Sequence, residues 1–131
     1  METINERYMD LKVINIRDAG EDKERVLIRV LNDCNLNGYM IIDNTYDDNG
    51  QISNVHRHVF VFPDFKVTKG NIVRLYTKKG SNFTVKANYG KDIVTYYNFY
   101  WGFESGSTVW NKDGDTAYLL HYDIVEPGDF E

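Results

Sequence analysis

The feature of this chain that most restricts its fold is the recurrence of apolar side chains at every second residue of short segments. In residues 26–31, Val26, Ile28 and Val30 share one face, and in residues 96–103 one face carries four aromatic side chains. Successive side chains of a β-strand point to opposite faces, so a period of two predicts half-buried strands. No segment shows a comparable helical period, and we therefore predict an all-β fold.

Turn residues divide the chain into about seven short strands. The predicted strands are residues 11–16, 26–31, 39–43, 55–62, 72–76, 96–103 and 116–122. Asn49 and Gly50 tolerate the positive φ angles of a tight hairpin turn. Pro63 cannot donate a ladder hydrogen bond, so the strand before it should end there. Short strands with regularly spaced turns are typical of a β-sandwich or barrel.

Two regions do not show this pattern. Residues 81–95 contain Asn82, Asn88 and Gly90 between short apolar stretches, and we expect a long and only partly ordered connection there. Residues 126–131 are expected to form a loose acidic tail.

Length and composition favour one domain. The chain has 131 residues, of which 42% are hydrophobic, 27% charged and 15% aromatic, and aromatic residues favour sheets. We expect a single domain over residues 1–131 with an ordered core from about residue 10 to residue 125. The single cysteine, Cys34, excludes an internal disulfide and is typical of a small buried apolar residue.

Several segments between about residues 26 and 120 follow one another in the same order as the conserved segments of a known domain family. They are Ile28-Arg29-Val30-Leu31-Asn32, Leu36-Asn37-Gly38-Tyr39-Met40-Ile41-Ile42-Asp43, Phe60-Val61-Phe62-Pro63 with Val67 and Gly70, Phe99-Tyr100-Trp101-Gly102, Val109-Trp110-Asn111, and Gly114-Asp115-Thr116-Ala117 with Leu119. Together these segments resemble the lamin tail domain, a module of nuclear lamins and of many bacterial proteins. The resemblance implies an immunoglobulin-like β-sandwich of about seven strands. It also implies contacts with proteins and, in some members, with DNA.

The residues of this signature are expected to have architectural roles. They are Gly38, Tyr39, Phe60, Phe62, Pro63, Trp101, Gly102, Trp110, Asn111, Gly114 and Asp115. Gly38 would permit a sharp turn into a strand, and Gly114 with Asp115 would form another tight turn. Tyr39, which stands in the place of the family's tryptophan, and Trp101 would anchor the two sheets.

The chain also departs from the family pattern. Arg29 stands where the family often has an acidic residue, and residues 121–125 lack the usual glycine of the last hairpin. Heptad repeats are absent, so filament assembly is not implied.

The aromatic segment predicts a binding surface. Tyr96 and Tyr100 lie on the strand face opposite the predicted core face, and Tyr89 is close by in the sequence. Tyrosine is favoured at protein interfaces because its ring is rigid and its hydroxyl is polar. We therefore expect a non-catalytic protein-binding module that uses this face or an edge strand. The alternative is that residues 81–95 fold over the same face.

Other partners are possible in principle. A nucleic-acid-binding domain would use Lys78, Lys79, Lys86 and Lys91, but the formal net charge of −5 disfavours this hypothesis. The exposed edges of a sheet can pair with another copy, so a weak homodimer is a further expectation. An enzyme-accessory domain is a third, less favoured hypothesis.

No residue pattern predicts catalysis or a bound cofactor. His56 and His58 share a strand face, but a metal site needs more ligands and His121 is the only other histidine. Two clusters of Asp and Asn side chains are typical of solvated turns rather than of a calcium site. One consists of Asp43, Asp47, Asp48 and Asn49, and the other of Asp113 and Asp115. No apolar run is long enough for a membrane span and no signal peptide is recognisable, so we expect a cytoplasmic location if this is the full native chain.

Overall fold

The computed structural model describes residues 9–43, 58–104, 106–110 and 116–129, and every regular element in them is a β-strand. The strands are β1 (Leu11–Arg17), β2 (Arg25–Val30), β3 (Cys34–Asn35), β4 (Tyr39–Asp43), β5 (Val59–Val61), β6 (Lys66–Val67), β7 (Ile72–Lys78), β8 (Phe83–Tyr89), β9 (Asp92–Phe103) and β10 (Ala117–His121). The predicted all-β class is confirmed. The described residues include no helix long and apolar enough to cross a membrane.

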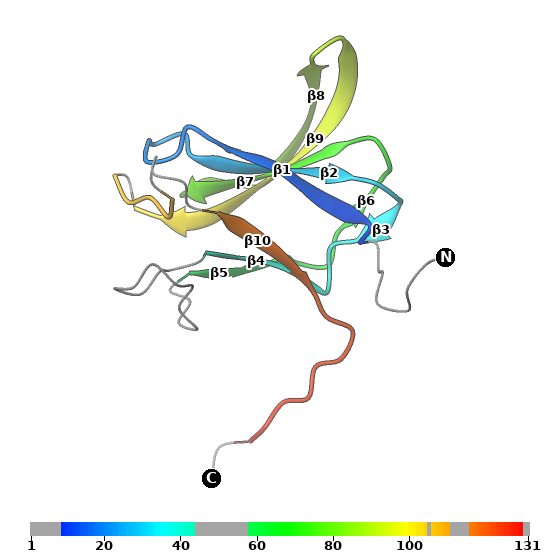
Figure 1. Cartoon of the computed structure of the whole chain (residues 1–131), viewed down its shortest axis with the longest axis vertical. Helices are drawn as coiled ribbons and strands as arrows, with labels where there is room; N and C mark the ends of the chain where they lie inside the picture. The colour runs from blue at the N-terminus through cyan, green and yellow to red at the C-terminus, as the bar shows by residue number, and fades with distance from the viewer. Residues whose placement is uncertain (1–8, 44–57, 105, 111–115, 130–131) are drawn as a thin grey trace.

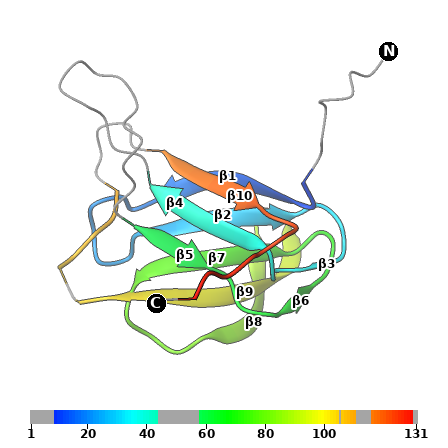
Figure 2. The same cartoon turned by 90° about the horizontal axis from the view of Figure 1, so that it is seen from below.

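The strands form two layers of unequal width. Five strands make one sheet in the order β1-β2-β7-β9-β8, three make a second in the order β10-β4-β5, and β3 pairs with β6 in a small ribbon. Figures 1 and 2 show the five-stranded sheet lying across the three-stranded sheet. Paired strands run antiparallel, with the exception of β7 and β9, which are parallel.

One face of each sheet contributes to a shared core. Its buried members are Leu11, Val26, Ile28, Val30, Leu36, Tyr39, Ile41, Phe62, Val67, Val73, Leu75, Tyr97, Phe99, Trp110 and Ala117. Aromatic rings pack edge-on between the layers, with centroid distances of 5.0 Å for Phe60–Phe62 and 5.5 Å for Phe62–Phe99. The faces predicted from alternation are therefore correct for β2 and for this part of β9.

Among the described signature residues, Gly38 lies at a turn and Tyr39, Phe62 and Trp110 lie in the core, whereas Pro63 is exposed after β5 and Gly102 is exposed within β9. Gly38 precedes β4 with φ at +99°, and an added Cβ would lie 2.9 Å from the carbonyl oxygen of Tyr122, so the predicted sharp turn is confirmed. Tyr39 is buried, while Trp101 is partly buried and packs against Trp110 at 5.8 Å. Asn111, Gly114 and Asp115 lie outside the described residues.

The predicted strands correspond to observed ones. β4 spans the predicted residues, and β1, β2, β7 and β10 agree with prediction to within two residues at each end. Of the predicted strand 55–62, residues 58–62 are described, and β5 (Val59–Val61) is the part of them that forms a strand. Residues 55–57 and the expected Asn49-Gly50 hairpin turn lie outside the described residues.

The expectation of a partly ordered connection over residues 81–95 was wrong. These residues form β8 and the start of β9, which pair as a hairpin with Tyr89 opposite Asp92. Gly90 has φ of +63° in the two-residue turn, as the first central position of a type II′ turn requires. Asn88 and the polar side chains of β8 are tolerated in a strand because β8 is exposed at the sheet edge.

The connection from β7 to β8 passes over β9, which lies between them in the sheet. Gly80 in this connection lies against the ring of Tyr100, and a Cβ at Gly80 would be 2.3 Å from two ring carbons. The same ring stacks on Tyr76 with a centroid distance of 5.1 Å and an interplanar angle of 13°. Only a residue without a side chain fits between the connection and this stack.

Glu24 is fully buried at the turn between β1 and β2. Its Oε2 accepts the backbone N–H of Gly20 at 2.7 Å, and its Oε1 accepts that of Val109 at 2.7 Å. The backbone N–H of Trp110 also donates to the carboxylate, with N···O distances of 3.2 and 3.3 Å. A buried carboxylate requires such donors, and here it holds residues 109–110 against a turn that is 85 residues away in sequence.

We expect Glu24→Gln to destabilise the fold by about 2–4 kcal/mol, because it weakens charge-assisted hydrogen bonds and points an amide N–H₂ at backbone donors. Glu21→Gln, at an exposed position of the same turn, is the control and should change the stability by less than about 0.5 kcal/mol. Urea unfolding measures both. Equal midpoints for the two variants would contradict the role of Glu24.

We expect Gly80→Ala to lower the stability by about 1–3 kcal/mol, because the added methyl group has to displace the Tyr100 ring from Tyr76. Near-ultraviolet circular dichroism should show the altered tyrosine packing, and thermal unfolding the loss of stability. Ser81→Ala, at the neighbouring exposed position, is the control. A Gly80→Ala variant with the spectrum and midpoint of the wild type would rule out the close approach.

Candidate functional site

β8 is an exposed edge strand of the wider sheet. It lies at the end of the strand order, and six of its seven residues are exposed. Figure 1 shows the β8–β9 hairpin projecting beyond the rest of the two layers. A sheet edge of this kind presents unpaired backbone groups to another extended chain.

The pairing register identifies the free backbone groups of β8. In an antiparallel hairpin with a two-residue turn, hydrogen-bonded pairs alternate with non-hydrogen-bonded pairs, starting at Tyr89 and Asp92. Thr84, Lys86 and Asn88 therefore direct their backbone N–H and C=O groups outward from the β8–β9 ladder, and of these the Asn88 carbonyl is occupied by the Tyr96 hydroxyl. Thr95, the partner of Lys86, is consistent with this alternation, because its N–H donates to the side-chain oxygen of Asn71 at 2.9 Å rather than to β8.

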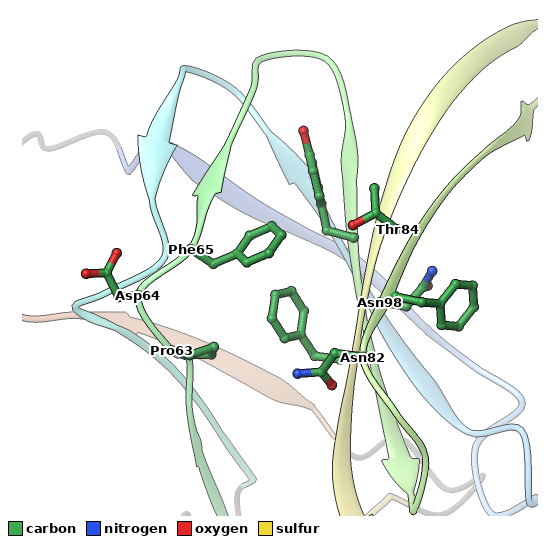
Figure 3. A pocket seen from close by; sticks show the side chains of 9 residues that line it. Pro63, Asp64, Phe65, Asn82, Thr84 and Asn98 are labelled. Atoms are coloured by element: carbon green, nitrogen blue, oxygen red, sulfur yellow. The ribbon is translucent and has the colours of Figure 1, made fainter.

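A pocket of about 270 Å³ lies beside the first residues of β8. Its walls come from the β5–β6 connection on one side and from β8 and β9 on the other (Figure 3). The lining residues are Pro63, Asp64, Phe65, Asn82, Phe83, Thr84, Tyr97, Asn98 and Phe99. The five-stranded sheet extends beyond the narrower sheet, and residues 63–65 face this part of its inner face across the pocket.

The pocket combines an aromatic wall with fixed polar groups. Phe65 packs edge-on against Tyr97 at 5.7 Å and Phe99 at 5.4 Å. Asp64 accepts a hydrogen bond from the Asn35 side chain at 2.6 Å, and Asn82 accepts one from the backbone N–H of Tyr100 at 3.2 Å. These polar side chains position the walls, and the lining includes no nucleophile with an adjacent general base.

The three predicted binding tyrosines do not form an open surface. Tyr96 is only 5% exposed, its hydroxyl donates to the Asn88 carbonyl at 2.9 Å, and the Arg74 guanidinium lies 3.8 Å from its ring centroid. Gly80 and Tyr76 pack on Tyr100, and burial raises the pKa of the Tyr100 hydroxyl. Tyr96 is therefore buried and Tyr100 is half-buried, so these two side chains do not form the expected open face. The alternative expectation holds in part, because Tyr89 packs in the cluster that contains Tyr96, and Phe83 stacks on Tyr100.

The tyrosines are covered because a second, small core forms on the outer face of the five-stranded sheet. Its buried members are Leu27, Ile72, Val94 and Tyr96, with Ile14 and Tyr89 packed against them. Arginine side chains lie over the rings, with Arg29 5.3 Å from Tyr89 and Arg25 6.0 Å from Tyr76. Long arginine side chains cover apolar surface in this way while their charged groups remain in water.

The four lysines proposed for nucleic-acid binding do not gather in one patch. Lys78 pairs with Asp22 at 3.8 Å, and Lys79 pairs with Glu104. Lys86 lies in the middle of β8, and Lys91 lies in the turn at its far end.

The candidate metal ligands do not assemble within the described ranges. His58 Nδ1 lies 2.8 Å from Asp43 Oδ2, and the ring of His121 stacks on Tyr39 at 4.2 Å. No three His, Cys, Asp or Glu side chains of the described residues form a group that could hold a metal ion. The remaining candidates, His56, Asp47, Asp48, Asn49, Asp113 and Asp115, lie outside the described residues.

Cys34 is a poor candidate nucleophile. Burial, together with the nearby negative charges of Asp10 and Asp33, raises the pKa of its thiol to about 11. The thiolate is the reactive form, so Cys34 remains an unreactive thiol at neutral pH.

No protein-family model, curated protein or solved structure matches this chain. The case for the candidate site therefore depends on the geometry of the structure alone.

The sequence analysis named an edge strand as one binding element, but it did not identify β8 or the pocket. The alternation of Phe83, Val85, Ala87 and Tyr89 was the signal that could have identified the strand.

Proposed function

We propose that this chain is a non-catalytic protein-binding module that receives an extended peptide segment along β8. The observation that carries the proposal is a seven-residue exposed edge strand directly beside an aromatic pocket. In strand addition, backbone hydrogen bonds supply affinity and pockets for alternate side chains supply specificity. The outward N–H and C=O groups of Thr84 and Lys86, together with the N–H of Asn88, would bond the peptide backbone, while the Asn88 carbonyl already accepts the Tyr96 hydroxyl.

The pocket supports the binding of one large apolar side chain of the peptide. Its volume of about 270 Å³ is below the range of about 300–1,000 Å³ that is usual for small-molecule sites, and it suits one large side chain. Phe65, Tyr97 and Phe99 favour an apolar or aromatic side chain. We therefore propose a peptide whose anchoring residue is apolar.

We also propose that the chain is related to the lamin tail domain and shares its immunoglobulin-like fold. Apart from the β8–β9 hairpin, β1, β2 and β7 are neighbours in one sheet, and β4 pairs with β10 in the other. Under this proposal they would correspond to strands A, B and E in one immunoglobulin sheet and to C with F in the other. The parallel pairing of β7 with β9 departs from that fold, and the hairpin would then be an insertion between strands E and F.

Single-stranded nucleic acid is the second candidate partner. The described arginines Arg25, Arg29 and Arg74 lie on the outer face of the five-stranded sheet among tyrosine rings, and such faces can stack bases. The chain's own side chains already cover Tyr96 and Tyr100, and for this reason the peptide is favoured.

Lys86→Pro tests the role of the edge. Proline removes the outward N–H of β8 and leaves the hydrogen bonds between β8 and β9 in place, whereas Lys86→Ala removes the same side chain and keeps the N–H. With tagged chains in nuclease-treated lysate of the source cell, we expect Lys86→Pro to lose roughly tenfold or more of each protein bound by the wild type. Mass spectrometry measures recovery, and Lys86→Ala should bind as the wild type does.

If Lys86→Pro folds and still recovers every wild-type partner, the edge is not the site. Recovery that disappears on nuclease treatment and falls steeply with salt would instead favour nucleic acid.

Thr84→Trp tests the role of the pocket. The larger side chain should fill the space between β8 and Phe65 and reduce partner recovery by roughly tenfold, because the anchoring side chain loses its place. Lys86→Trp, two residues along the same face of β8 and outside the pocket lining, is the matched control. Equal recovery by the two variants would show that the pocket does not contribute to binding.

A further inference from the structure

The outer face of the three-stranded sheet is an apolar surface. Its strands direct Ala117, Leu119, Tyr39, Ile41 and Phe60 toward the five-stranded sheet, and alternation directs their neighbours outward. The outward residues of these strands are Tyr118, Leu120, Met40, Ile42, Val59 and Val61, which we call the outer apolar face.

The pairing register arranges the outer apolar face in two rows. Tyr118, Ile42 and Val59 lie side by side in one row, and Leu120, Met40 and Val61 lie side by side in the other. None of the six side chains is charged. Val61 is 52% exposed and Leu120 is 38% exposed, so the described residues leave much of this apolar surface open to solvent. Contiguous exposed apolar surface marks interaction sites.

We infer that a second copy of this chain packs against the outer apolar face, with two such faces meeting across a twofold axis. Each copy has a formal net charge of −5, so two copies repel each other in general. The outer apolar face is uncharged throughout, and it is therefore complementary to itself both in charge and in apolar character. A twofold interface uses the same patch of both subunits and requires this kind of self-complementarity.

The segment after β10 supports the same occupant. Ile124 is 85% exposed and Val125 is 71% exposed, and Figure 1 shows the chain beyond β10 projecting on the side away from the five-stranded sheet. A copy packed on the outer apolar face would lie on the side toward which this segment projects. Each chain would then cover the two apolar side chains of the other.

The size of the face predicts weak association. β4 and β10 are five residues long and β5 is three residues long. At about 3.3 Å per residue and about 4.8 Å between strands, they cover less than roughly 15 Å by 17 Å of sheet. That area is small beside the roughly 800 Å² per partner of a standard stable interface. The expected dimer is therefore concentration-dependent, and it leaves β8 on the other sheet free.

Sedimentation equilibrium of the purified chain from micromolar to millimolar concentration tests this inference. The wild type should shift from monomer to dimer mass. Val61→Lys should weaken dimerisation by roughly tenfold or more, because it places a charge on both contacting faces. Ile93→Lys, which introduces the same charge at an apolar residue that is 74% exposed on β9, should dimerise as the wild type does. Val59→Lys is a second variant of the same face.

Three results would overturn the inference. They are a wild type that stays monomeric at millimolar concentration, a folded Val61→Lys or Val59→Lys variant that dimerises normally, and a dimer that only Ile93→Lys disrupts. A monomeric wild type that binds another protein in a Val61-dependent manner would assign the face to that protein. Lys86→Pro should leave dimerisation unchanged, so this inference and the proposed peptide binding can fail separately.

Discussion

The buried carboxylate of Glu24 connects segments that are far apart in the sequence. It accepts backbone hydrogen bonds from the β1–β2 turn and from residues 109–110, and so fixes where Trp110 enters the core. The indole N–H of Trp110 in turn donates to the carbonyl of Thr116 at 3.3 Å, directly before β10. Because β10 pairs with β4, this series of contacts links the edge of the wider sheet to the placement of the narrower one. A compensated buried charge of this kind determines position more than it adds stability.

The unequal width of the two sheets then explains the candidate site. Three strands cannot cover five, so β8 and part of the inner face of β9 extend beyond the narrower sheet. The β5–β6 connection covers this area incompletely, and Phe65 with Phe99 forms the wall that remains beside the pocket. The free edge and the pocket are therefore two consequences of one architectural feature. The β7–β8 connection adds to it, because it has to cross β9 at Gly80 to place β8 outermost.

Alternation in the sequence predicted the strands and their faces better than it predicted what covers each face. β4 and the core side of β9 could be predicted because a buried face requires apolar residues at every second position. β8 was missed because an exposed edge strand tolerates Asn and Lys, which sequence reasoning associates with connections. The period of Tyr96 places it opposite the core, which left both an open face and cover by residues 81–95 as expectations. The Arg74 side chain of β7 lies over its ring, and its hydroxyl bonds the Asn88 carbonyl of β8. Such coverage, like the partners of Glu24, depends on contacts between distant segments that no local pattern records.

The two proposed surfaces belong to different sheets, and this separation has a functional consequence. Packing through the outer apolar face would involve β10, β4 and β5, while β8 lies at the edge of the other sheet. A dimer would therefore carry two free β8 edges, one on each copy. When two binding sites are linked, the second binding event becomes intramolecular if the partner can reach both sites, and overall avidity rises well above the affinity of one site. A weak peptide site and a weak dimer interface can thus together produce firm binding to a partner that presents two copies of the same extended segment.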